Sequence, residues 1–294
     1  MKQPIELRRI RDFGEIINDT FTFLKENFKP LFTCLFALCG FFVLAGAATT
    51  ALTQTNTMNM YATKFDTNSY QAASPFISYV VSAIFNAIVI VFGQLSIYLT
   101  TLCYISVYLE KKDGKPTLTE VWGYFKYYFL RILGSGFLIT LLCFVGFLMC
   151  ILPGVYLMTV MYLVFPIIVM ENTSFRYAFN KSFTLIKDNW WTVFGILFVI
   201  TLIVGVLGSF ASVPLSIIVA AKAFLSLKSF ALPLVILFSL MQNILMLAYC
   251  LVAIAIAMCY FSLSEQKEGL GILSRMDAFG KNTDNSTDLP AEQY

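Results

Sequence analysis

Few side chains in this chain could transfer protons or bind metals, and those few lie at the edges of long apolar stretches. The chain contains no histidine, which excludes histidine-based metal sites, Ser-His-Asp triads and Cys-His catalysis. Four acidic residues beside the apolar stretches offer acid–base chemistry: Glu110, Glu120, Glu171 and Asp188. No Gly-rich phosphate loop followed by lysine occurs. We therefore predict that the protein is not an enzyme and carries neither metal nor cofactor.

Six apolar stretches dominate the chain. They cover about residues 31 to 53, 77 to 109, 132 to 151, 154 to 170, 192 to 221 and 231 to 262. A helix of roughly 20 apolar residues matches the roughly 30 Å hydrocarbon core of a bilayer, where backbone groups must pair internally. Hydrophobic residues make up 59% of the chain and charged residues 13%. The sequence predicts an all-α polytopic membrane protein with six transmembrane helices.

The positive charges are distributed unequally between the loops. Of the 20 Lys and Arg residues, all but Lys64, Lys222 and Lys228 fall in residues 1 to 30, the second and fourth loops, and the C-terminal tail. Because positive loops stay in the cytoplasm, we expect the N- and C-termini there and residues 54 to 75 as the main outer loop. All seven cysteines lie within apolar stretches, as small buried apolar residues do.

Two cytoplasmic segments have the periodicity of amphipathic helices. In the first, Ile10, Phe13, Ile17, Phe21, Leu24 and Phe28 recur at steps of three or four residues, which places them on one helical face. Phe175, Phe179, Phe183, Ile186 and Trp190 repeat the pattern in the second. An aromatic stripe opposed by charges beside a membrane predicts a helix lying in the interface plane. The alternative is that the two helices pack against each other as a cytoplasmic cap.

These two segments resemble each other in sequence. Residues 13–32 align without gaps on residues 175–194, with seven identities in twenty. A fainter third copy opens at Thr117, where Thr117 and Glu120 have capping-box spacing. The chain thus forms one membrane domain, 1–264, of three parallel repeats, about 5–112, 113–172 and 173–264, each an interfacial amphipathic helix followed by two spans. Residues 265–294 are predicted to be a polar cytoplasmic tail, partly disordered.

The spans themselves contain few polar residues and two informative prolines. Asn86, Gln94, Gln242 and Asn243 are the amides within them, and we assign them to hydrogen bonds between helices rather than to substrate binding. Pro166 should kink the fourth span, and Pro214 should interrupt or end the fifth. Residues 213 to 233 are then either an outer amphipathic helix or a shallow re-entrant piece.

The region from Pro153 onward resembles a known family. Pro153-Gly154, Tyr156, Pro166, Glu171-Asn172, Ala178, Ser182, Leu185 and Trp190-Trp191 are similar to the membrane domain that precedes the catalytic domain in bacterial glycerophosphoryl diester phosphodiesterases, and to related stand-alone inner-membrane proteins of unknown function. The similarity covers roughly residues 150–195. The basic residue common in that family after Pro-Gly is missing between Leu157 and Leu163. The resemblance implies a membrane platform in the bacterial inner membrane without the phosphodiesterase activity, because no catalytic domain follows.

One group of residues around the fourth loop combines charges with aromatic anchors, as recognition of anionic lipids requires. The candidates for contact with a head group or a partner are Lys25, Glu171, Asn172, Arg176, Lys181, Lys187, Trp190 and Trp191. A structural alternative is that Asn172 caps the following helix.

Our main hypothesis from the sequence is a non-enzymatic platform that binds membrane lipids or a protein partner and serves envelope homeostasis. We expect no nucleic acid among its partners. The alternative is a carrier or flippase for an apolar or lipidic substrate. A cavity between the repeats would favour the carrier.

Overall fold

The computed structural model describes residues 6–64, 73–111, 115–225 and 231–269, and every regular element in that part is a helix. The helices are α1 (Phe13–Glu26), α2 (Phe28–Lys64), α3 (Ala73–Glu110), α4 (Leu118–Met149), α5 (Ile151–Tyr162), α6 (Val164–Glu171), α7 (Phe175–Ile186), α8 (Trp190–Leu225), α9 (Ala231–Leu245), the short 3₁₀ helix η1 (Met246–Tyr249) and α10 (Cys250–Glu268).

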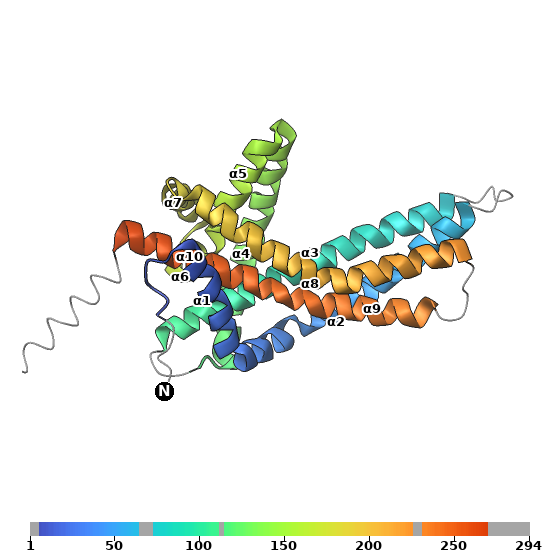
Figure 1. Ribbon diagram of the computed structural model, residues 1–294, viewed down its shortest axis with the longest axis horizontal. Coiled ribbons are helices and arrows are strands. Elements are labelled where there is room, and N and C mark those ends of the chain that lie inside the picture. Colours follow the sequence, from blue (N-terminus) through green and yellow to red (C-terminus); the bar gives the residue numbers. More distant parts are fainter. Residues whose placement is uncertain (1–5, 65–72, 112–114, 226–230, 270–294) are drawn as a thin grey trace, which may run out of the picture.

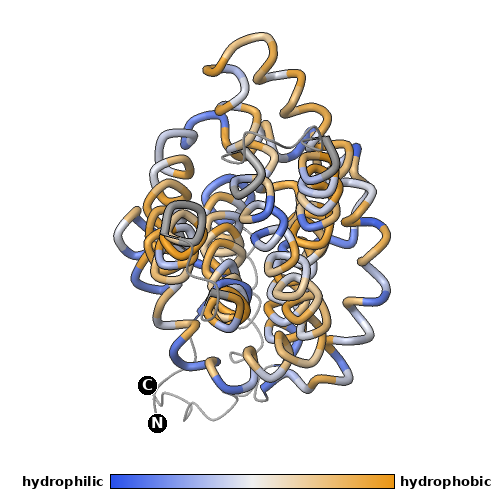
Figure 2. The backbone as a smooth tube through the Cα atoms, turned by 90° about the vertical axis from the view of Figure 1, so that its right-hand side faces the viewer, coloured by the Kyte–Doolittle hydropathy of each residue, from blue (hydrophilic) through white to orange (hydrophobic). Residues whose placement is uncertain are grey.

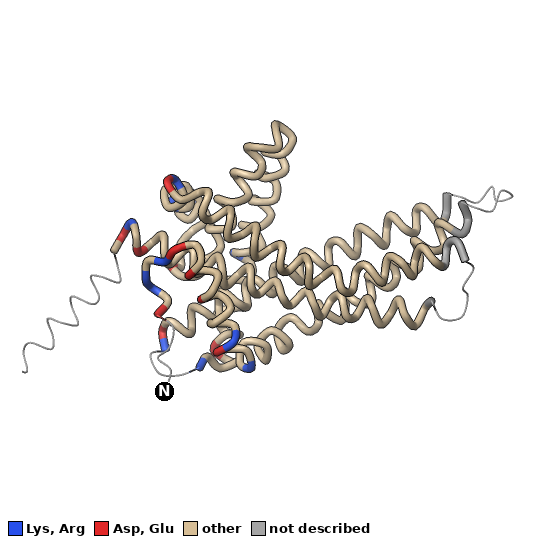
Figure 3. The backbone as a smooth tube through the Cα atoms, in the orientation of Figure 1, with Lys and Arg blue, Asp and Glu red and all other residues tan. Residues whose placement is uncertain are grey.

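The fold is built around six apolar stretches that are long enough to cross a membrane as helices, as predicted. Figure 1 shows α2, α3, α8 and α9 running together toward one end of an elongated bundle. The charges of the described residues gather at the opposite end (Figure 3). Apolar residues colour the outside of the helices as well as the inside (Figure 2), and Phe41 and Phe210 are 75% and 66% exposed. Such an apolar exterior suits acyl chains rather than water.

The centre of the charged end is α10, which is enclosed by other helices. Every residue from Cys250 to Glu265 is buried, and α10 packs against α1, α3, α7 and α8. Its small residues, including Ala253, Ala255 and Ala257, let these neighbours approach closely. The 3₁₀ turn η1 separates α10 from α9, so the sixth span consists of two helices, which the sequence did not predict.

The fourth span is interrupted three residues before Pro166, which was predicted to kink it. Proline has no backbone N–H, so the carbonyl of Tyr162 loses its normal helical donor. The chain bends at Leu163, and α6 begins at Val164. Tyr98 on α3 donates a hydrogen bond to the carbonyl oxygen of Tyr162 over 3.4 Å. The Tyr98 hydroxyl therefore replaces the donor that is lost at the break.

Several predicted interruptions were wrong. Pro214 lies inside α8, which continues to Leu225, so residues 213–225 are neither a separate outer helix nor a re-entrant piece. Most of the predicted outer loop is helical, because α2 ends at Lys64 and α3 begins at Ala73. Helix α10 extends through Glu268, past the predicted start of the tail. The predicted disorder of the tail concerns residues from 270 onward, which lie outside the described residues.

The segment from Thr117 also differs from its prediction. Thr117 and Glu120 form a capping box, as expected, but no turn separates the following polar segment from the apolar one. Both belong to the single helix α4, which returns as α5 after a turn at Cys150. Cys150 is exposed and Cys143 half-buried, so the prediction of buried cysteines was wrong at these two positions.

Candidate functional site

The candidate residues lie at the charged end, where α1 and α7 pack against α10. In α1 the buried residues are Ile16, Asp19, Thr20 and Phe23. The predicted stripe lies on another side: Phe13, Phe21 and Phe28 are 41%, 37% and 52% exposed. Phe13 reaches α8, where a Cβ on Gly195 would lie 3.1 Å from its ring. The aromatic stripe of α1 therefore faces largely out of the protein.

Helix α7 is held against α10 by a charged cluster that the sequence predicted only in part. The Nζ of Lys181 lies 2.8 Å from Glu171 Oε1 and 2.6 Å from Glu268 Oε1. The hydroxyl of Tyr260 donates to Glu171 Oε1 at 2.5 Å. Burial lowers the pKa of Lys181, but the two carboxylates outweigh burial and raise it overall. Glu171 and Lys181 thus form an ion pair with each other. The cluster also contains Glu268 and Tyr260, which no sequence pattern indicated.

The structural alternative, that Asn172 caps the helix that follows it, was wrong. Asn172 adopts a left-handed conformation with φ of 50° and ends α6, while Ser174 occupies the N-cap position of α7. Asparagine tolerates this conformation better than most residues. Its side-chain oxygen accepts a hydrogen bond from Arg131 Nη1 at 2.9 Å. Asn172 therefore links the α6–α7 turn to α4.

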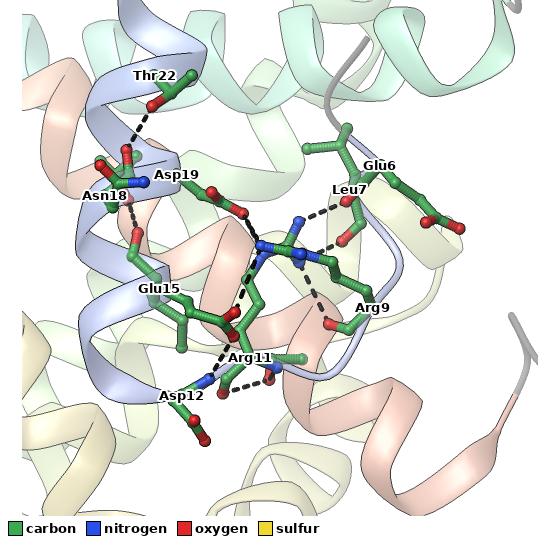
Figure 4. Close-up of polar contacts among 12 residues, drawn as sticks. Glu6, Leu7, Arg9, Arg11, Asp12, Glu15, Asn18, Asp19 and Thr22 are labelled. Carbon is green, nitrogen blue, oxygen red and sulfur yellow. Dashed lines mark hydrogen bonds and ion pairs between the residues drawn. The ribbon is translucent and has the colours of Figure 1, made fainter. Parts of the chain in front are cut away.

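A second buried cluster, which the sequence analysis missed, fixes the N-terminal segment (Figure 4). The Arg11 guanidinium is completely buried and its Nε lies 2.7 Å from Asp19 Oδ2. It also donates to the backbone carbonyls of Glu6, Leu7 and Arg9. The Arg11 N–H donates to the Ser262 hydroxyl on α10 at 3.0 Å. Such a cluster holds a buried charge fully paired. Only the Asp12–Glu15 capping box beside it leaves a sequence signal.

The remaining candidates are exposed, except for Trp190. Lys25, Arg176 and Lys187 form no ion pair with any residue in the described part of the chain. Trp191 is 76% exposed, whereas Trp190 is half-buried and stacks on Tyr156 at 5.8 Å and on Phe194 at 5.1 Å between ring centroids. The structure thus separates the eight candidates into an internal group, Glu171, Lys181 and Trp190, and an outward group, Lys25, Asn172, Arg176, Lys187 and Trp191.

The acidic residues first considered for catalysis all have structural partners. Glu110 accepts a hydrogen bond from the Tyr124 hydroxyl at 2.5 Å. Glu120 lies 2.8 Å from Lys111, and Asp188 lies 3.2 Å from Lys267. Within the described ranges, no three Cys, Asp or Glu side chains are grouped as metal ligands would be. The arrangement of these carboxylates serves to join helices.

The charged end also contains a small pocket between α1, α8 and α10. It measures about 40 Å³ and is lined by residues that include Arg11, Asn189, Cys259 and Ser262. Ligand sites typically measure about 300–1,000 Å³, so this pocket suits one water molecule better than a lipid. No protein-family model, curated protein or solved structure matches the chain.

Proposed function

We propose that this protein is a non-enzymatic platform in the bacterial inner membrane, whose cytoplasmic face binds the head groups of anionic lipids. The charged end would lie at the cytoplasmic surface, with α1 and α7 in the interface plane. Envelope homeostasis is the process that such a platform would serve. The predicted resemblance to the membrane domain of glycerophosphoryl diester phosphodiesterases agrees with a platform of this kind.

One observation carries the proposal: among the described residues, the cations Lys25 on α1, Arg176 on α7 and Lys187 after it are exposed and form no ion pair, and exposed aromatic rings lie at the same end. Arg11 and Lys181 are locked into internal clusters, whereas Lys25, Arg176 and Lys187 have no ion-pair partner among the described residues. A basic residue near an anionic membrane surface contributes about 1 kcal/mol. Trp191 adds an aromatic anchor of the type found at membrane interfaces. Exposed cations and an exposed ring together suit a lipid surface.

The relation between α1 and α7 supports the proposed repeat. Thr20 and Ser182 are aligned in sequence and are both completely buried. Asn27 and Asn189, aligned at the ends of the two segments, each join a neighbouring helix. Asn27 accepts from the Tyr104 hydroxyl at 3.0 Å, and Asn189 donates to Gln266 at 3.1 Å. Two copies of one motif would present two equivalent faces to the inner leaflet.

Lipid analysis of the purified protein tests the proposal. In the variant K25Q/R176Q/K187Q, native mass spectrometry after graded delipidation should show fewer bound anionic lipids per chain. The matched control is K64Q/K222Q/K228Q, which removes three cations on the predicted outer side and should retain the wild-type number. Equal retention by both variants would contradict head-group binding by these cations.

The alternative, a carrier or flippase, has one observation in its favour. The hydroxyls of Thr49 and Thr50 lie 2.8 and 3.1 Å from Asn86 Oδ1, and Asn243 Nδ2 lies 3.4 Å from Thr50 Oγ1, within otherwise apolar helices. Ser239 nearby is completely buried, and its hydroxyl has no hydrogen-bond partner in the described part.

A dithionite assay of fluorescent lipid in proteoliposomes separates the two functions. The platform predicts no flipping above protein-free vesicles. A carrier predicts flipping that Asn86→Ala reduces.

A further inference from the structure

The α4–α5 hairpin, residues 132–162, reverses direction without a polar loop, because α4 ends at Met149 and α5 begins at Ile151. It contains no Asp, Glu, Lys, Arg, Asn or Gln. At its turn, Met149, Ile151 and Leu152 are 81%, 72% and 79% exposed. A turn that emerges into water usually carries polar side chains or glycine and proline with polar neighbours. Here the residues from Phe144 to Val155 offer only Cys150 as a weakly polar side chain.

Two hydrogen bonds pair part of the backbone of the turn within the segment. The Cys150 N–H donates to the carbonyl of Gly146 at 3.1 Å, and the Gly154 N–H donates to the carbonyl of Cys150 at 3.3 Å. The two glycines let the limbs close tightly, because a Cβ on Gly154 would lie 2.5 Å from the Phe147 ring. Each backbone group paired within the segment lowers the free-energy cost of placing the turn in hydrocarbon.

The returning limb is interrupted at Leu163, before it could cross a bilayer as one continuous helix. Helix α5 has 12 residues, and these extend over roughly 18 Å at about 1.5 Å per residue. The hydrocarbon core is about 30 Å thick. After Leu163 the chain bends into α6, whose residues Val164, Ile167 and Ile168 are completely buried between neighbouring helices. By contrast, α2, α3 and α8 have 37, 38 and 36 residues.

The hairpin also points in a different direction. Figure 1 shows α4 and α5 projecting to one side of the bundle, near the end where the charges gather in Figure 3, while α2, α3, α8 and α9 run toward the opposite end. The view along the bundle shows the same projection, coloured mostly as hydrophobic (Figure 2). If the long helices cross the membrane, the hairpin leaves them on the cytoplasmic side.

We propose that the α4–α5 hairpin is a re-entrant wedge that inserts among the acyl chains of the cytoplasmic leaflet and returns without reaching the other side. The crossing segments are then α2, α3, α8 and the α9–α10 pair. Both termini remain on the same side, so terminal fusions do not distinguish this topology from six crossings. The proposal relies on the membrane placement of the bundle and does not depend on head-group binding by Lys25, Arg176 or Lys187.

The native Cys150 at the turn allows a direct test. Sealed membrane vesicles of both orientations are treated with a membrane-impermeant maleimide, and the protein is then purified. The wedge predicts that Cys150 stays at the background set by Cys150→Ala in both orientations, and that it reacts after detergent solubilisation. Labelling from either aqueous side would overturn the proposal. Tyr61→Cys at the far end of α2, in the Cys150→Ala background, is the positive control for the outer side.

A second measurement locates the turn without relying on thiol reactivity. The protein labelled at Cys150 with a fluorophore in detergent is reconstituted into vesicles that contain lipids with nitroxide quenchers on the acyl chains. Strong quenching by these lipids together with protection from aqueous iodide is the result expected of the wedge. Quenching by iodide alone would place the turn in water and refute it.

Discussion

The hydroxyl of Tyr98 on α3 donates to the backbone carbonyl oxygen of Tyr162, the acceptor that Pro166 leaves without its helical donor. Tyr98 and Tyr162, which are 64 positions apart, are thus joined because Pro166 has no N–H to donate to the Tyr162 carbonyl. The contact connects α3 to the break between α5 and α6, so it holds the bend that turns the hairpin away from the bundle.

Tyr98→Phe should destabilise the protein, because the Tyr162 carbonyl then loses its donor while the aromatic contact with Phe165 at 5.4 Å is retained. The expected cost is about 1 kcal/mol. It is measured by thermal unfolding in detergent, with the exposed Tyr61→Phe as a control without effect. In a Pro166→Ala background, where the alanine N–H supplies the missing donor, Tyr98→Phe should cost less. An equal cost in both backgrounds would contradict the compensation.

Lys181→Met should loosen α7 from α10, because it leaves Glu171 and Glu268 together without their cation. The expected loss of stability is about 2 kcal/mol, below that of a fully buried pair. Lys187→Met, at an exposed lysine without an ion-pair partner in the described part, should have little effect. Thermal unfolding compares the variants. An equal effect of the two substitutions would mean that the cluster contributes nothing.

The same cluster predicts a dependence on alkaline pH. The pKa of Lys181 in the folded state is raised above its ordinary value of 10.5. Its contribution is therefore complete below that value and is lost as the pH rises through the higher folded pKa. The stability difference between wild type and Lys181→Met should stay constant near neutral pH and shrink above about pH 10.5. A difference that grows with pH would exclude this assignment.

Arg11→Lys should release the N-terminal segment, because an ammonium group cannot reproduce the bonds of the guanidinium to Asp19 and three carbonyls. We expect a loss of about 3 kcal/mol, because buried hydrogen bonds of a charged group are lost, and faster hydrogen exchange in α1. Cys259, which lines the pocket beside Arg11, should become reactive to small maleimides. Arg8→Lys, at an exposed position, is the control. Unchanged exchange in α1 would show that Arg11 does not hold it.

Gly46→Ala should separate α2 from α9. A Cβ at this position would lie 2.2 Å from Asn243 Oδ1, and the Asn243 amide is held by Ser239 and Thr50. Overpacking of this type costs about 1–3 kcal/mol. Asn243→Ala should rescue part of the loss, whereas Gly205→Ala, with open space around it, should not destabilise. If Asn243→Ala gives no rescue, the close contact is not the cause.

The sequence predicted those parts of the fold that depend on local chemistry. An apolar stretch predicts a membrane-spanning helix because the prediction needs only the length of the stretch and the thickness of the hydrocarbon core. Pro166 predicts a break because it lacks an N–H. Pro214 misled because a helix packed against neighbours can continue through a proline when other groups satisfy the freed carbonyl. The Arg11 cluster was missed because its bond to Ser262 joins residues 251 positions apart. Of the candidate site, Glu171 and Lys181 were found. Glu268 and the separation into internal and outward groups were not, because both depend on where α10 lies.

The central claim is that the charged end, with α1 and α7, faces the cytoplasm. A C-terminal fusion tests it most directly, because α10 ends at Glu268 within that end. Fused after Tyr294, green fluorescent protein should be fluorescent and alkaline phosphatase inactive in bacterial cells. An active phosphatase with a dark fluorescent protein would place the charged end outside, and the proposed binding of lipids in the inner leaflet would be wrong.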